Sequence, residues 1–452
     1  MTGRTVTGTF AEWSSTGRYE DFSADAQRKA VNVVFDSIGA MTACSVLPEV
    51  KAIVQFLARV GGAGQCSIIG HSLITTVVSA ATANGAMAHG DEVDPVHLKS
   101  AGGHVAAGIV PTALTVAEWL DKPGKEVLRA TVLGYDVGGR LMSIFYKLRD
   151  YDTRRFYPTA VVGNMSSAVT AGVLLGLNRQ QMEVAMCLAA YQGAGVDNVV
   201  KDSGHTAKTF QIGFANRNGL TAALLAADGI HAPSGILDGK YSLFDAFFNA
   251  PDAGVDMDKD LGRYFSIVDV MHKRYPVGSP NQTYLQGVLN IIERHQVKAD
   301  DIAEIEVQIP SRGVSRVPSN RHASISGLSV CAIAAATGKL DFYVLHDPNG
   351  ITDPRVADMQ KKIKFVGRDD WKGQEHGLHA IVTIRTRRGD TLREEVWHEP
   401  MTVAELDRKF DELVIPRLGP EKARRVSQLL KNLAEAASVR PLMIELRDSD
   451  RG

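Results

Sequence analysis

A change in hydrophobic period near residue 270 constrains the fold of this chain more than any other feature. Before that point, apolar residues recur every three or four positions, which is the spacing of a helix that buries one face. After Ser23, a predicted N-cap, the first such series is Ala30, Val34, Ile38 and Met41. The same spacing predicts further helices over residues 50–60, 75–89, 109–120, 125–146, 159–177, 179–191 and 208–228.

Beyond residue 270 the period becomes two, which is typical of a half-buried strand. Residues 302–309 alternate apolar and polar side chains. Residues 380–386 and 392–397 alternate on either side of Arg388-Gly389-Asp390, which predicts a β-hairpin with a glycine-containing turn. Helical spacing returns at Thr402, where a Thr-x-x-Glu pattern forms a capping box, and continues to about residue 435.

These patterns predict a mainly α protein with a large all-helical domain and a smaller inserted α+β domain. We place the first part of the helical domain at residues 1–269, the α+β domain at residues 270–400 and the return to the helical domain at residues 401–452. A chain of 452 residues is long enough for this division.

Charge and apolar composition favour a small-molecule partner. The net charge is -1 and the basic residues are scattered, so no surface for nucleic acid or an anionic membrane is indicated. We expect no membrane span, because no run of about 20 apolar residues occurs. The four cysteines are far apart and form no CxxC pair, which predicts reduced, buried thiols in a cytoplasmic protein.

Two familiar motifs are incomplete. Gly70-His71-Ser72 begins like a hydrolase nucleophile elbow, but Ile74 stands where the closing glycine belongs. Gly193-Ala194-Gly195 lacks the third glycine of a dinucleotide fingerprint and has no strand–helix unit around it. Neither a serine nucleophile nor a nicotinamide cofactor is therefore expected.

Three imidazoles and three carboxylates crowd a segment of sixteen residues, which is the strongest chemical feature of the sequence. They are His89, Asp91, Glu92, Asp94, His97 and His104. Such groups bind metals, transfer protons or hold substrates, and a solvated loop is the alternative. Their spacing matches no metal-ligand motif, so we favour an acid–base or binding cluster.

The segment from Ala83 to Trp119 resembles the signature of the MmgE/PrpD family, in which an Ala-Asn-Gly helix leads to His, an acidic run and a second His. Further similar segments follow in the same order: Gly134-Tyr135-Asp136 with Arg140, residues 156–163, residues 208–219 with Gly229, Lys273-Arg274-Tyr275-Pro276 and residues 323–338. The family includes 2-methylcitrate dehydratases, cis-aconitate decarboxylases and iminodisuccinate epimerases. The resemblance implies a helical domain with an α+β lid, a homodimer, and no metal or organic cofactor.

The resemblance also implies which residues act on a small di- or tricarboxylate. These reactions pass through or near a carbanion beside a carboxylate, so they need a base, an acid and cations. Lys208 and His104 match the family's active site, and Lys208 could hold a carboxylate or, if desolvated, act as a base. We predict Lys208, His104 and Tyr157 as catalytic residues. The predicted substrate-binding residues are Glu92, Asp94, His97, Arg154 and Lys273.

Several positions depart from the family pattern. The decarboxylase pattern has His where this chain has Tyr157, and a second active-site His is replaced by Gly278. Ser329 stands where Tyr is frequent, and Glu92 replaces an Asp. A tyrosine whose pKa is lowered by a nearby cation could pair with Lys208 as acid and base.

We therefore expect a cofactor-independent hydro-lyase of the 2-methylcitrate dehydratase type. The alternatives are an epimerase of an imino- or amino-dicarboxylate, a decarboxylase, and a non-catalytic homologue that binds a small acid.

Overall fold

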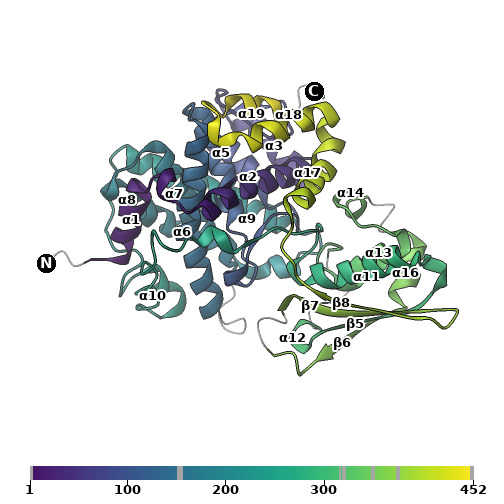
Figure 1. The fold of residues 1–452 in the computed structure, drawn as a ribbon. Helices are drawn as coiled ribbons and strands as arrows, with labels where there is room; N and C mark the ends of the chain where they lie inside the picture. Colours follow the sequence, from purple (N-terminus) through teal and green to yellow (C-terminus); the bar gives the residue numbers. More distant parts are fainter. Residues whose placement is uncertain are drawn as a thin grey trace.

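The computed structural model describes residues 4–149, 156–314, 317, 322–347, 352–372 and 377–447. A helical body occupies one side of the molecule and a smaller region with a sheet occupies the other (Figure 1). The body helices are α1 (Val6–Thr16), α2 (Ala24–Cys44), α3 (Pro48–Val60), α4 (Val77–Ala88), α5 (Val110–Trp119), α6 (Gly124–Leu148), α7 (Pro158–Leu175), α8 (Arg179–Tyr191), α9 (Thr206–Ala227) and α10 (Leu243–Phe248). The predicted helices are confirmed, with ends that shift by no more than three residues and those of α8 unchanged.

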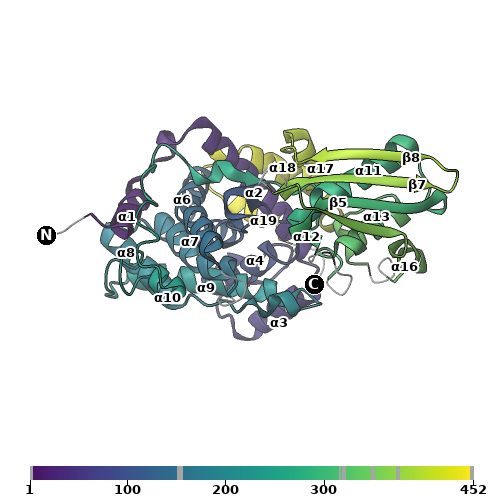
Figure 2. The ribbon, with the colours of Figure 1, turned by 90° about the horizontal axis from the view of Figure 1, so that it is seen from below.

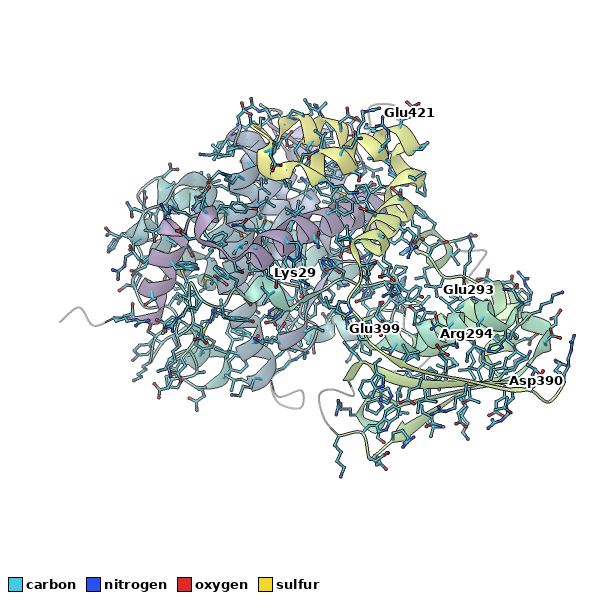
Figure 3. All side chains as sticks on the ribbon, in the orientation of Figure 1. Lys29, Glu293, Arg294, Asp390, Glu399 and Glu421 are labelled. Atoms are coloured by element: carbon cyan, nitrogen blue, oxygen red, sulfur yellow. The ribbon has the colours of Figure 1, made fainter. Side chains whose placement is uncertain are left out.

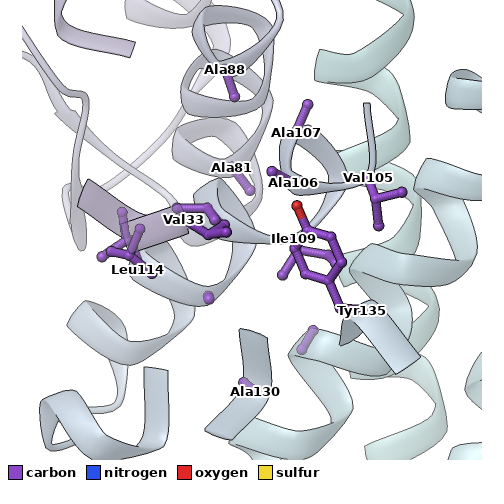
Figure 4. Packing of buried hydrophobic residues seen from close by; sticks show 14 of the residues in the cluster. Val33, Ala81, Ala88, Val105, Ala106, Ala107, Ile109, Leu114, Ala130 and Tyr135 are labelled. Carbon is purple, nitrogen blue, oxygen red and sulfur yellow. The ribbon is translucent and has the colours of Figure 1, made fainter. Parts of the chain in front are cut away.

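Small side chains let the central helices approach one another closely. A Cβ atom added to Gly219 of α9 would lie 2.4 Å from the carbonyl oxygen of Asn164 in α7. Tyr135 of α6 is fully buried, and Figure 4 shows it beside the small side chains of Ala106 and Ala107. The body is therefore packed around buried helices rather than around a sheet.

Helix α7 is long and apolar enough to cross a membrane, but 94% of it is buried inside the body. Together α2 and α3 also pass this test, although they are bent by 86°. A long apolar helix that is almost wholly covered by other helices is what the core of a globular protein requires.

The sheet region contains a four-stranded sheet in the order β6-β5-β7-β8. Its strands are β5 (Ile302–Pro310), β6 (Ile363–Arg368), β7 (His379–Thr386) and β8 (Thr391–Trp397). The strand over 302–309 and the hairpin around Gly389 are confirmed, whereas β6, which pairs in parallel with β5, was not predicted. Helices α11 (Gln282–His295) and α13 (Gly327–Thr337) lie along the sheet (Figure 2). The shorter helices here are α12 (Ser311–Val314), α14 (Phe342–Leu345) and α16 (Pro354–Gln360).

The chain then returns to the body. Glu399 lies where the two parts meet, and Asp390 lies at the far end of the hairpin (Figure 3). Thr402 caps α17 (Val403–Leu418) through the predicted capping box with Glu405, and α18 (Pro420–Lys431) and α19 (Arg440–Glu445) follow. Buried apolar residues of these helices join the cluster of the first 270 residues, whereas residues 277–384 supply a second cluster. The chain is thus mainly α, as expected, and its four cysteines are free and buried.

Short two-stranded ladders complete the body. Strand β1 (Cys66–Ser67) pairs with β2 (Ile74–Thr75), and β3 (Val96–His97) pairs with β4 (Val270–Met271). The β3–β4 pair matters for function, because it brings the residues after the acidic segment next to the segment that leads into the sheet region.

Candidate active site

The loop between α4 and β3 carries three carboxylates that are almost completely buried. Asp91 and Asp94 are each 1% exposed and Glu92 is 9% exposed. Helix α4 ends at Ala88, so the chain turns through this loop inside the protein rather than over its surface. Buried carboxylates are costly without charged or hydrogen-bonding partners, and each of these three has its own set.

Glu92 binds two lysines that are themselves buried. Its Oε1 accepts a hydrogen bond from Lys208 Nζ at 2.8 Å, and its Oε2 accepts one from Lys273 Nζ at 2.6 Å. Lys208 lies in the first turn of α9, and Lys273 follows β4. The structure thus brings three of the predicted site residues together.

Charge interactions keep this group ionised. Burial acts to raise the pKa of Glu92, but Lys208 and Lys273 hold it well below its usual value. Burial acts to lower the pKa of Lys208, but the neighbouring carboxylates, led by Glu92, raise it above its usual value. These directions favour Lys208 as an ammonium that holds a carboxylate, the first of the two roles expected for it, over the role of a desolvated base.

Asp94 holds two imidazoles at once. Its Oδ2 lies 2.8 Å from His104 Nδ1 and 3.0 Å from His89 Nδ1. Burial acts to raise the pKa of Asp94, but the interactions with His104 and His89 keep it well below its usual value. With Nδ1 of each ring donating to Asp94, each Nε2 carries a lone pair.

The two Nε2 atoms face different partners. His89 Nε2 lies 2.7 Å from the hydroxyl of Tyr157, and His104 Nε2 lies 4.0 Å from Glu92 Oε2. Burial, together with Lys273 and Lys208, lowers the pKa of His104, so its ring is neutral near pH 7. Burial raises the pKa of Tyr157 well above 10, which is opposite to the expected lowering by a nearby cation.

Asp91 faces the sheet region. Ser324 Oγ donates to its Oδ1 at 2.7 Å, and His346 Nε2 lies 3.3 Å from its Oδ2. His205 Nε2 and His322 Nδ1 lie 3.9 and 4.0 Å from Oδ1. Three imidazoles from separate segments therefore surround this carboxylate, and two of them come from the sheet region.

A lysine of α17 also holds the backbone of this loop. Lys409 of α17 donates to the backbone oxygen of Val93 at 3.0 Å and pairs with Asp36 of α2 at 2.6 Å. The C-terminal helices thus fix the backbone between Glu92 and Asp94.

A small pocket opens beside this group. Its volume is about 140 Å³, and its walls combine polar and apolar residues: Glu92, Tyr157, Val199, Asp202, His205, Lys208 and Ile325. The arrangement offers a buried ammonium, a neutral imidazole with a free lone pair and a protonated phenol. These are the groups needed to hold a carboxylate and to move protons beside it.

Comparison with known proteins agrees with this chemistry. The sequence model of the MmgE/PrpD N-terminal domain matches residues 8–256, and that of the C-terminal domain matches residues 275–435. The chain belongs to the MmgE/PrpD family. It is 25% identical over 470 residues to a cis-aconitate decarboxylase of Aspergillus terreus, covering 97% of this chain and 95% of the relative. It is 26% identical over 354 residues to the cis-aconitate decarboxylase of Mus musculus, covering 73% of this chain and 70% of the relative.

One of the residues predicted from the family resemblance, His97, is not joined to the other predicted site residues. His97 contacts Ser100 and Ser266 instead, because β3 directs it toward α6, and burial lowers its pKa to about 4. Arg154 lies outside the described residues. Glu92, predicted to contact substrate, lines the pocket and also pairs with the two lysines.

Three imidazoles at the site of this MmgE/PrpD member were not predicted, namely His205, His322 and His346, and His89 was named only as part of the acid–base or binding cluster. His89 and His205 adjoin segments that carried signals, namely the acidic run and the Lys208 motif. His322 directly precedes the segment of weaker similarity, and His346 carried no local signal. The decarboxylase pattern has histidines at the sequence positions of Tyr157 and Gly278. None of these imidazoles stands at either position.

His89, Asp94 and His104 also form a possible donor set for a metal, since one ligand atom of each lies within 4.8 Å of the others. Their Nδ1–Oδ2 distances of 2.8 and 3.0 Å fit hydrogen bonds, which already use Nδ1 of both rings. This geometry favours the acid–base role over metal binding.

Proposed function

We propose that this chain is a lyase that removes a proton beside a carboxylate of a small polycarboxylic acid, by the chemistry of a 2-methylcitrate dehydratase. The observation that supports it best is that one carboxylate, Asp94, positions both a base and an acid. It orients His104 directly, and it orients Tyr157 through His89. Elimination of water requires both groups at one substrate, as does epimerisation by two groups, whereas decarboxylation needs no base.

Each step of the proposed reaction uses a different residue. His104 Nε2 accepts the proton from the carbon next to the carboxylate, and the charge that develops is held by the ammonium of Lys208. The bond from the neighbouring carbon to its hydroxyl breaks, and Tyr157 gives its proton to the departing oxygen. Water leaves, His104 releases its proton to solvent and Tyr157 regains one from solvent, so both groups return to their starting forms. The high pKa of Tyr157 suits protonation of a strongly basic leaving group.

Decarboxylation is the second candidate, because the relatives above are named cis-aconitate decarboxylases. That reaction needs an acid at the carbanion but no base. The same His104 could serve it once protonated, and activity would then rise toward acid pH. The epimerase and the non-catalytic homologue stay as further outcomes of the experiment below.

The remaining expectations from the sequence belong to this proposal. We propose that the enzyme needs no metal or organic cofactor, works as a cytoplasmic homodimer, and uses the region of residues 270–400 as a lid. The contacts of Asp91 with Ser324, His322 and His346 support the lid, because they join this region to the loop that carries the site.

Proton NMR in D2O with a panel of di- and tricarboxylates tests the proposal. We expect an alkene product or deuterium uptake beside a carboxylate, and loss of both in His104→Gln. His97→Gln is the matched control, because it also removes a buried histidine near this loop but one that is not joined to the site. Loss of carbon dioxide would establish the decarboxylase instead, and uptake with inversion alone the epimerase. Binding without exchange or product would overturn the enzymatic proposal.

A further inference from the structure

Nitrogen atoms of four side chains converge on the carboxylate of Glu92. Lys208 Nζ and His205 Nε2 lie 2.8 and 3.3 Å from Oε1. Lys273 Nζ and His104 Nε2 lie 2.6 and 4.0 Å from Oε2. Three of them, the two lysine Nζ atoms and His205 Nε2, lie within hydrogen-bonding distance, and groups gathered in this way are how proteins bind the carboxylate of a ligand. Here a side chain of the protein itself occupies that place, while lining the pocket.

The two lysines nearest the pocket already face a carboxylate of the protein before any ligand enters. Glu92 and Asp202 line the pocket as carboxylates, Lys208 lines it as an ammonium, and Lys273 lies on the other side of Glu92. Asp202 is fixed in place, because it accepts hydrogen bonds from Ala207 N, Thr206 Oγ1 and Gly204 N at the start of α9. Each further carboxylate that a ligand buries here lacks a cation among these residues, which is costly.

The pocket is also small, and part of its wall is apolar. Its volume of about 140 Å³ is well below the roughly 300–1,000 Å³ that is typical of drug-sized ligands. Val199 and Ile325 give it an apolar wall, which cannot bind a carboxylate. The described residues thus offer one polar side, at Lys208 and His205, for one buried carboxylate.

We propose that Glu92 sets the charge of the substrate, so that this site selects a small acid with two carboxylates and discriminates against tricarboxylates. This inference rests on the proposed function, because it concerns the same site. One ligand carboxylate shares Lys208 and His205 with Glu92, and the second points toward the pocket opening. The acid expected as substrate is therefore a 3-hydroxy dicarboxylate rather than a citrate-like compound.

Matched pairs of acids test this on the full chain by calorimetry. Glutarate and propane-1,2,3-tricarboxylate share a carbon chain and differ by one carboxylate, as do 3-hydroxyglutarate and citrate. We expect the wild-type protein to bind each dicarboxylate at least about tenfold more tightly than its tricarboxylate partner, which is about 1.4 kcal/mol. Equal or tighter binding of either tricarboxylate overturns the proposal.

Glu92→Gln keeps the length of the side chain and removes its charge. We expect the ratio of tricarboxylate to dicarboxylate affinity to rise at least about tenfold in this variant. Glu118→Gln is the control, because Glu118 is a buried carboxyl group that is bound to Ser67, away from the pocket. The affinity ratio of this control variant is expected to stay at the wild-type value. An unchanged ratio in Glu92→Gln overturns the proposal. If this variant does not fold, the wild-type ratios decide alone.

The NMR assay separates this proposal from the proposed function. Turnover of a tricarboxylate would leave the lyase standing and overturn the role of Glu92. Selective binding of dicarboxylates without exchange or product would support the role of Glu92 and overturn the lyase.

Discussion

Asp94 Oδ2 lies 2.8 Å from Nδ1 of His104, and this contact decides which nitrogen of the ring can act on a substrate. A carboxylate acceptor at Nδ1 places the proton there and leaves the lone pair on Nε2. The same oxygen also holds His89 at 3.0 Å. One side chain therefore sets the tautomer of both imidazoles.

Asp94→Asn is expected to reduce kcat by on the order of 10²- to 10⁴-fold, because an amide can donate to Nδ1 and stabilise the wrong tautomer. Steady-state kinetics would check this, with His97→Gln as a control of matched burial. A structural role alone would lower the melting temperature and leave the kcat of the folded fraction intact.

The pH dependence of activity follows from His104. Its pKa is lowered by burial and by the two lysines, so the neutral, basic form persists below the usual histidine pKa of about 6.5. We expect kcat of a dehydratase to stay level from pH 8 down to about 6.5 and to fall only at lower pH, as Nε2 gains a proton. A profile that instead rises toward acid would favour decarboxylation with His104 as the acid.

Helical periodicity predicted the body well because packing itself imposes that spacing. Helices such as α3 and α9 bury one face, so their buried residues repeat with the helical period, whereas α7 is buried almost all round. Strand β6 escaped prediction since its burial does not alternate and its parallel partner, β5, is more than fifty residues earlier. Pairing over such a separation leaves no local mark on the sequence.

The site was predictable only where its residues are dense or where a resemblance marked them. The acidic loop stood out by its density of charges. Lys208 and Lys273 are ordinary lysines in sequence, and the family resemblance alone pointed to them. His346 reaches Asp91 across more than 250 residues, so only the fold could place it at the site.

His97 offers a test of stability that is independent of activity. Its pKa is about 4 in the folded chain against about 6.5 when unfolded, so the unfolded chain binds its proton first as the pH falls. The contribution of this group to the free energy of unfolding is fully present above pH 6.5. It falls by about 3 kcal/mol as the pH decreases to 4. In urea titrations the drop between pH 7 and pH 4 should be smaller by this amount in His97→Gln. If the free energy of unfolding falls equally between pH 7 and pH 4 in the two proteins, His97 does not titrate in this way.

Asp91 is expected to hold the sheet region against the body. Asp91→Asn keeps the size of the side chain but removes the charge that faces His346, His322 and His205, and it leaves a poorer acceptor for Ser324. Loss of such a buried contact costs about 1–3 kcal/mol. Because the sheet region has its own hydrophobic cluster, this loss should free its contact surface without unfolding it.

Hydrogen exchange would detect that change as faster exchange confined to residues 322–347. The KM should rise more than kcat falls, since a loosely held region impairs closure over a bound substrate more than the chemistry itself. Glu49→Gln is the control, because Glu49 lies in the field of the same imidazoles without contacting Asp91. Uniformly faster exchange across the body would mean that Asp91 stabilises the whole chain, and unchanged exchange at 322–347 would mean that it does not hold this region.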